Sequence, residues 1–167
     1  MPARSSRCMP HRADRTVTTP TANKPAVMAT RPATLYTSDV LAAATGLAAW
    51  PWNDGLPHKG EARSRTCGSA LAIGFALNAT GHVVDLGIRT HACAIGQAAA
   101  FAFAQGAPGR DFADIAAARA ALGLWLAGEG DLPAWPGLGV IAKARAYPSR
   151  HGAIVLAWDA ALEALKR

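Results

Sequence analysis

Two alternating segments separated by a turn lie near the middle of the chain and constrain its fold more than any other feature. Between residues 71 and 77 every second residue is large and apolar, and the residues between them are alanine or glycine. This pattern is typical of a half-buried strand. Residues 78–81, NATG, are rich in turn formers, and alternation resumes at Val84, Leu86 and Ile88. We therefore expect an antiparallel β-hairpin over this part of the chain.

A cysteine lies beyond each outer end of the expected hairpin. Cys67 precedes its first strand and Cys93 follows its second strand. Because an antiparallel register brings the two outer ends together, we expect both thiols at one end of the sheet. Cys93 also directly precedes a predicted helix of small residues, whose unpaired N–H groups favour a thiolate.

Helical patterns occupy most of the remaining chain. A short, polar edge strand over residues 61–66 is expected to precede the hairpin. The other segments have apolar residues at helical spacing and start signals for helices. These helices are expected after Ser38, after Cys93, after Asp111, at Pro136 and after Ser149. The order predicts an α+β fold, with a small three-stranded antiparallel sheet and about five helices packed mainly on one face.

Residues 1–34 differ in composition from the rest. They hold six basic residues and a single acid, Asp14, and show no hydrophobic periodicity, so we expect a disordered basic tail followed by one domain over residues 35–167. A start assigned too early, with Met28 as the alternative start, is a second interpretation. Cys8 lies in this tail and is given no role. Residues 35–167 hold eleven basic and ten acidic residues, which disfavours nucleic acid as a partner.

The cysteine count and the hydropathy limit the cellular setting. Three cysteines are too few, and odd in number, for a disulfide framework of a secreted protein. No apolar run approaches membrane-spanning length, and the first residues lack the apolar core of a secretory signal. We therefore expect a cytoplasmic protein with free thiols and no membrane partner.

Cys67, Cys93 and His151 are the candidate metal ligands. His151 lies near the start of the last predicted helix, and its imidazole would join the two thiols if that helix crossed the end of the sheet. Two thiolates and an imidazole suit zinc, ferrous iron or an iron–sulfur cluster. Ser69 and His91 are supporting candidates for a further ligand. Arg150 is a supporting residue beside His151, or alternatively pairs with an acid such as Glu163.

The order of these features resembles the NifU-like, or IscU-type, iron–sulfur cluster assembly scaffold family, and most closely its sulfur-transfer branch. The resemblance covers roughly residues 35–165 and implies a three-stranded antiparallel sheet with helices packed on it. The matching elements are Cys67-Gly68 before a strand, a turn near Gly81, ACAIGQA over residues 92–98, and YPSR over residues 147–150 before a helix with Leu156 and Trp158.

The resemblance also implies ligand positions, and two of them differ in this chain. Cys67 matches the first family cysteine and Cys93 the second. The family's acid after Cys-Gly is Ser69 here, and the third cysteine, the usual sulfur acceptor, aligns with Ala153. His151, two residues upstream of Ala153, is the candidate replacement ligand, although a histidine cannot carry a persulfide.

From these residues we expect a scaffold or carrier for iron–sulfur cluster assembly, and not an enzyme. Iron or a [2Fe–2S] cluster would bind through Cys67, Cys93 and His151. The resemblance implies a cysteine desulfurase and recipient apo-proteins as partners. Three alternatives stay open: a structural zinc site of two cysteines, a histidine and one oxygen; a metal-free interaction module that regulates a cysteine desulfurase; and a thiol enzyme with a Cys93–His151 pair.

Overall fold

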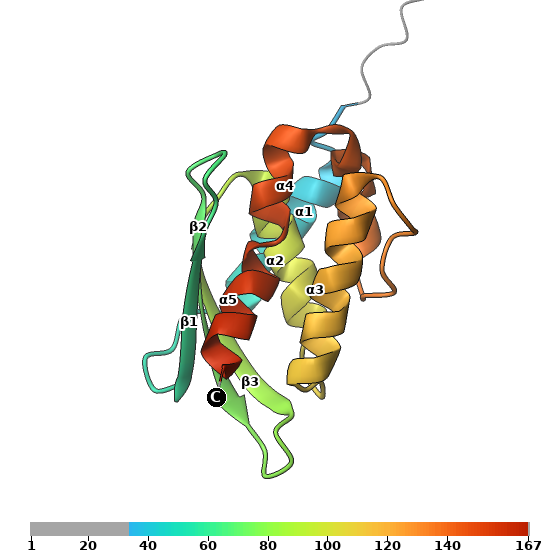
Figure 1. Ribbon diagram of the computed structural model, residues 1–167. Coiled ribbons are helices and arrows are strands. Elements are labelled where there is room, and N and C mark those ends of the chain that lie inside the picture. The colour runs from blue at the N-terminus through green and yellow to red at the C-terminus, as the bar shows by residue number, and fades with distance from the viewer. Residues whose placement is uncertain (1–33, 167) are drawn as a thin grey trace, which may run out of the picture. The chain divides into compact units, whose positions relative to one another are not determined.

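The computed structural model describes residues 34–166, which form an α+β fold with the helices on one side of a sheet (Figure 1). All but the last residue of the predicted basic tail, including Cys8 and Met28, lie outside the described residues. The division into a tail and a domain therefore stays a prediction. None of the helices in residues 34–166 combines the length and the apolar character needed to cross a bilayer.

Three strands and five α-helices make up the fold, as the sequence predicted. The strands form one antiparallel sheet in the order β1-β2-β3. In chain order the elements are α1 (Ser38–Gly46), the 3-10 helix η1 (Leu47–Ala49), β1 (His58–Arg63), β2 (Ala70–Leu77), β3 (Val83–His91), α2 (Ala94–Gly106), α3 (Phe112–Ala127), the 3-10 helix η2 (Leu138–Ala146), α4 (Pro148–Ile154) and α5 (Leu156–Leu165).

The β2–β3 hairpin has the register that its alternation predicted, with one exception. The large residues of β2 face the helices and are buried at Leu71, Ile73 and Phe75, and Ile73 pairs with Ile88. The prediction that Val84 faces inward is wrong, because Val84 is 57% exposed. A bulge near the turn lets Leu77 pair with Val83, so that Val83 takes the buried position.

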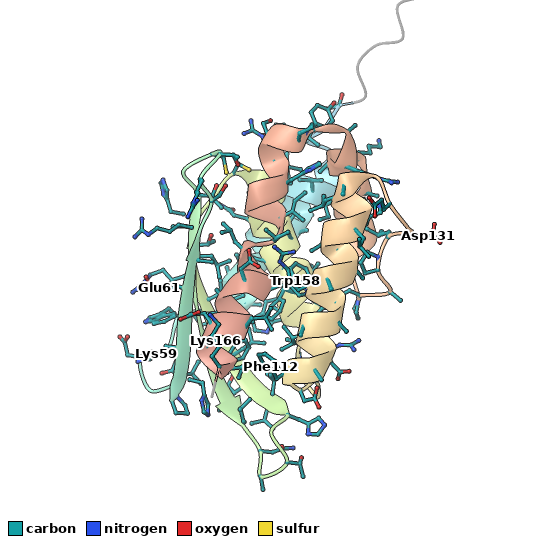
Figure 2. All side chains as sticks on the ribbon, viewed as in Figure 1. Lys59, Glu61, Phe112, Asp131, Trp158 and Lys166 are labelled. Atoms are coloured by element: carbon teal, nitrogen blue, oxygen red, sulfur yellow. The ribbon has the colours of Figure 1, made fainter. Side chains whose placement is uncertain are left out.

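The core lies between the sheet and the helices. α5 packs across β1 and β2, and Trp158 of α5 sits among the helices (Figure 2). The centroid of its ring lies 5.2 Å from the ring centroid of Phe103 and 5.4 Å from that of Trp135. Lys59 and Glu61 of β1 project from the opposite face of the sheet (Figure 2). Residues 51–56 cover part of this face, since Leu56 packs against Gly74 and the Pro51 carbonyl lies close to Gly87.

Two predicted caps are wrong. Thr37, and not Ser38, caps α1, because its hydroxyl accepts a hydrogen bond from the N–H of Val40 at 3.3 Å. Ser149 does not cap the last helical segment, since α4 begins one residue earlier with Pro148 in its first turn. That segment is also two helices, because α4 ends at Ile154 and α5 begins at Leu156.

Three further features differ from expectation. Helical spacing with Ile115 would place Phe112 on the inward face of α3, but its side chain is 45% exposed. β1 spans His58–Arg63 and so begins three residues before the edge strand expected over residues 61–66. Glu163 pairs with Lys166 at 2.5 Å, which leaves the predicted pairing with Arg150 unmade. The cap at Asp111 is confirmed, since its carboxylate accepts from the N–H of Asp114.

Candidate metal centre

A cavity of about 260 Å³ opens at one end of the sheet. Its walls come from the β1–β2 connection, the β3–α2 junction and the start of α4, which lie together at the upper end in Figure 1. The lining residues are Cys67, Gly68, Ser69, His91, Ala92, Cys93 and Arg150. The structure thus brings both candidate cysteines and all three supporting residues to one place.

Cys67 is surrounded by hydroxyl groups. Its sulfur lies 3.2 Å from Ser64 Oγ and 3.1 Å from Ser69 Oγ. As a thiol it donates to one of these oxygens, and as a thiolate it accepts from both hydroxyls. Burial alone raises the pKa of the Cys67 thiol, but hydrogen bonds from Ser64, from the hydroxyl and N–H of Ser69 and from Thr66 outweigh burial. The pKa of Cys67 is therefore lowered, which favours the thiolate that binds metals and attacks sulfur.

The loop around Cys67 is fixed by its own hydrogen bonds and by α4. Ser64 N–H donates to the carbonyl of Ser69 at 2.8 Å, and the hydroxyls of Ser64 and Thr66 lie 3.0 Å apart. A Cβ at Gly152 would overlap Ser64 Oγ and lie 2.8 Å from Thr66 Oγ1. Only a glycine lets α4 approach the hydroxyls this closely.

Ser64 and Thr66 are site residues that sequence reasoning missed. The sequence feature that could have identified them is the group of hydroxyl side chains at positions 64, 66 and 69, on both sides of Cys67. Ser64 and Ser69 are 8% and 5% exposed and are the buried polar residues of the described chain. Buried hydroxyls next to a cysteine indicate a polar site, because such groups are rarely buried without partners.

Cys93 occupies the N-cap position of α2 and is half-buried. Its side chain makes no capping hydrogen bond to the first N–H groups of α2. The junction is held instead by Gln97, whose backbone N–H donates to the Cys93 carbonyl at 3.0 Å and whose Nε2 donates to the Ala92 carbonyl at 2.9 Å. Cys93 is thereby positioned at the cavity without using its thiol.

His151 does not join the two cysteines. Its Nε2–H donates to the carbonyl of Arg145 at 2.9 Å, and the side chain lines a different cavity together with Arg119 and Leu126. Successive residues of a helix point about 100° apart. Because Arg150 faces the cysteine cavity, His151 is turned away from it, and the expected convergence of the three ligands is absent.

The placement of His151 bears on two of the alternative interpretations. Within residues 34–166 there is no cluster of three or more histidine, cysteine or acidic residues that could hold a metal ion. The structural zinc site and the Cys93–His151 thiol enzyme both required this imidazole, and the geometry gives them no support. The ligand roles of Cys67 and Cys93 stay predictions.

Ala153, at the position of the third family cysteine, lies behind the cavity wall. It is 1% exposed, and its Cβ is 3.1 Å from the place where a Cβ on Gly96 would lie. The same place is 2.9 Å from the Cβ of Ala92, which lines the cavity. α4 and the start of α2 are therefore closely packed here, beside the cysteines but without a third thiol.

Basic side chains gather around the cysteine end of the sheet, although residues 35–167 are nearly neutral in total. Arg150 is half-buried in the cavity wall, and the other basic residues are exposed. A second cavity of about 220 Å³ adjoins the first through His91 and includes one acid, Glu61. The arginines at this end are Arg63, Arg65, Arg89 and Arg150.

No protein-family model matches this sequence, and no curated protein matches it. The structure does match solved structures. A nitrogen-fixing NifU-like protein (N-terminal part) from Brucella abortus has a TM-score of 0.71 and 24% identity, over 78% of this chain and 91% of that chain. The chain has the NifU-like fold.

Two further structures share this NifU-like fold. A candidate iron–sulfur cluster assembly scaffold protein for the SUF system from Fervidobacterium islandicum AW-1 has a TM-score of 0.71 and 18% identity, over 79% of this chain and 97% of that chain. A protein described only as hypothetical has a TM-score of 0.61 and 21% identity, over 77% of this chain and 97% of that chain. The resemblance read from the sequence is therefore confirmed at the level of fold.

The hydroxyl groups around Cys67 should make it reactive at lower pH than a free cysteine. In a chain with Cys8→Ser and Cys93→Ser, we expect the rate of alkylation of Cys67 by iodoacetamide to reach half of its maximum below the pH found for free cysteine. Adding Ser64→Ala removes one hydrogen bond to the thiolate, raises the pKa of Cys67 and slows alkylation several-fold at pH 7. Ser149→Ala, an exposed hydroxyl outside the cavity, is the matched control. An unchanged pH profile in Ser64→Ala would show that the hydroxyl does not act on the sulfur.

Proposed function

We propose that this chain is a scaffold or carrier for iron–sulfur cluster assembly that binds iron or a [2Fe–2S] cluster through Cys67 and Cys93. The observation that carries the proposal is that both thiols of a NifU-like fold line one cavity, where Cys67 is held among hydroxyl donors. Thiolates are the preferred ligands of iron–sulfur clusters. The descriptions of the Brucella and Fervidobacterium proteins support the same class of function.

The residues of the cavity have distinct proposed roles. Cys67 and Cys93 are the ligands. Because Ala153 stands where the family's usual sulfur acceptor would be, one of these two cysteines must accept sulfur, and Cys67 is the candidate because its hydrogen bonds favour the thiolate. Ser69 orients Cys67 by its hydrogen bond. His91 and Arg150 line the cavity and supply a weak further ligand and a positive charge. A site with only two thiolate ligands per chain would bind a cluster weakly. Weak binding suits a protein that transfers the cluster to other proteins.

The proposed partners follow from this function. A cysteine desulfurase would supply sulfur, and recipient apo-proteins would take the assembled cluster. The protein would act by binding and transfer, not by turnover of a small molecule. A cytoplasmic location stays the expectation from the sequence.

A second function is favoured by the two departures from the family pattern. Ser69 replaces an acid and Ala153 replaces a cysteine, so the fold is also suited to a metal-free module that regulates a cysteine desulfurase. In that case Cys67→Ser/Cys93→Ser would bind the desulfurase as tightly as the wild-type chain and would hold no iron. The scaffold function instead requires both thiols for iron.

Anaerobic reconstitution with iron and sulfide, followed by desalting, tests the scaffold function. Cys8→Ser should serve as the background, so that the only thiols are those of the cavity. We expect iron and sulfide in equal amounts with visible charge-transfer absorption, and a loss of nearly all of both in Cys67→Ser or Cys93→Ser. The matched control is His151→Ala, which removes a potential ligand outside the cavity and should leave iron and sulfide unchanged.

Two results would contradict the scaffold function. One is iron at background level in the reconstituted chain with both cysteines present. The other is an iron content that is unchanged in Cys67→Ser/Cys93→Ser but lower in His151→Ala. That result would place the metal in the cavity lined by His151 and not in the cysteine cavity.

A further inference from the structure

We propose that a cavity on the face of the sheet opposite the helices binds a free acidic α-amino acid, such as glutamate. The cavity has a volume of about 220 Å³, below the roughly 300–1,000 Å³ that is usual for drug-sized ligands, so its occupant is a small molecule. The site uses neither thiol of the cysteine cavity and goes beyond the proposed function. All three strands line it, through Glu61, Arg63, Ala70, Ala72, Arg89 and His91.

The strand register sets opposite charges on either side of an alanine. Glu61 of β1, which projects from this face (Figure 2), pairs with Ala72 of β2, and Ala72 pairs with Arg89 of β3. Neighbouring strands lie about 4.8 Å apart, so the backbones of Glu61 and Arg89 are separated by roughly 10 Å. Neither side chain takes part in an ion pair within residues 34–166. A ligand with both an ammonium and a carboxylate group, as in an α-amino acid, would pair with both.

The next row of paired residues is basic on both sides. Arg63 pairs with Ala70, and Ala70 pairs with His91, about 6.6 Å further along the strands. The planar guanidinium of Arg63 suits a carboxylate, and the imidazole of His91 can donate a ring N–H. A second negative group on the ligand would lie here. The two rows together therefore favour an acidic amino acid over a neutral one.

Residues 51–56 close one end of the cavity and hold one of its cations. They cover the sheet beyond the first row. The guanidinium of Arg89 lies over the ring of Trp52, 4.6 Å from its centroid, and Trp52 Nε1–H donates to the carboxylate of Asp54 at 2.7 Å. Stacking of this kind leaves the N–H groups of a guanidinium free for a carboxylate. Ala72 is 6% exposed, so its methyl group lies at the bottom of a cavity and not on a flat surface.

Isothermal titration calorimetry with L-glutamate tests the site, using the full chain with Cys8→Ser and a reductant present. We expect saturable binding of one glutamate per chain. Binding should be at least ~10-fold weaker in Glu61→Gln and in Arg89→Gln, because each loses a hydrogen-bonded charge pair with the ligand. The matched control is Arg65→Gln, which removes an exposed cation that does not line the cavity and should leave the affinity unchanged. Urea midpoints equal to that of the parent chain would show that the variants are folded.

Two related ligands separate recognition of an amino acid from attraction of any anion. Glutarate lacks the ammonium group and L-glutamine lacks the second carboxylate, and each should bind at least ~10-fold more weakly than glutamate. Cys67→Ser/Cys93→Ser should bind glutamate as the parent chain does, so the result is independent of iron binding and of the proposed function.

Three results would overturn the amino-acid site. The first is the absence of saturable glutamate binding. The second is an affinity for glutarate equal to that for glutamate, which would indicate attraction of anions by surface charge alone. The third is an affinity for glutamate that Glu61→Gln and Arg89→Gln leave unchanged.

Discussion

Replacing Ala153 with cysteine should convert a weak cluster site into a strong one. The Cβ of Ala153 lies beside Gly96, which also contacts Ala92. Because Ala92 lines the cavity that holds both thiols, we expect a sulfur at position 153 to approach this cavity from behind its wall. Sites of four ligands bind structural zinc with about 10–16 kcal/mol, or on the order of 3 kcal/mol for each ligand. By that measure we expect Ala153→Cys to lose iron to a chelator at least ~10-fold more slowly than the wild-type chain.

The matched control for this gain is Ala153→Ser, which has nearly the same size and no thiolate. Both variants place a larger side chain in a site that is 1% exposed, and both should lose about 1–3 kcal/mol of stability by overpacking. Only the cysteine should slow iron loss. Equal iron retention in Ala153→Cys and Ala153→Ser would show that position 153 does not reach the cavity.

Replacing Gly60 with alanine should destabilise the whole fold. A Cβ at Gly60 of β1 would overlap the carbonyl oxygen of Ala160 and lie 2.5 Å from the backbone nitrogen of Ala164. These are backbone atoms of α5, so they cannot move aside as a flexible side chain does. We expect a loss of about 3 kcal/mol or more, against a total stability of about 5–15 kcal/mol for a domain.

Urea unfolding followed by circular dichroism measures the effect of Gly60→Ala as a lower midpoint at an unchanged slope. Gly139→Ala is the matched control, since a Cβ at Gly139 meets nothing within 4 Å and should change the midpoint little. A urea midpoint for Gly60→Ala equal to that of Gly139→Ala would contradict the close packing of α5 against β1 at Gly60.

Much of the fold could be predicted because its signals are local. Alternation in β2, small residues in α2 and the cap at Asp111 each depend on neighbouring residues alone. The meeting of Cys67 and Cys93 also followed, because a hairpin register fixes which ends of the strands lie together. The family resemblance is the source of the proposed iron–sulfur function.

The errors have equally specific causes. A bulge shifts the alternation by one residue, and nothing in the apolar pattern distinguishes Val83 from Val84 as the inward residue. The side that His151 faces depends on a rotation of about 100° between adjacent helical residues, which motif spacing does not fix. The positions of Ser64 and Thr66 around Cys67 depend on a loop and on the close approach of Gly152, and both are set by tertiary packing.

Mössbauer spectroscopy of the full chain with Cys8→Ser, reconstituted anaerobically with iron-57, tests the central claim most directly, because it reports the ligands of the iron itself. The claim is that Cys67 and Cys93 of this NifU-like fold hold an iron–sulfur cluster. It predicts coupled ferric ions in tetrahedral sulfur sites and the disappearance of this signal in Cys67→Ser/Cys93→Ser. Iron found only in oxygen- or nitrogen-ligated sites, with the same spectrum in the double variant, would contradict it.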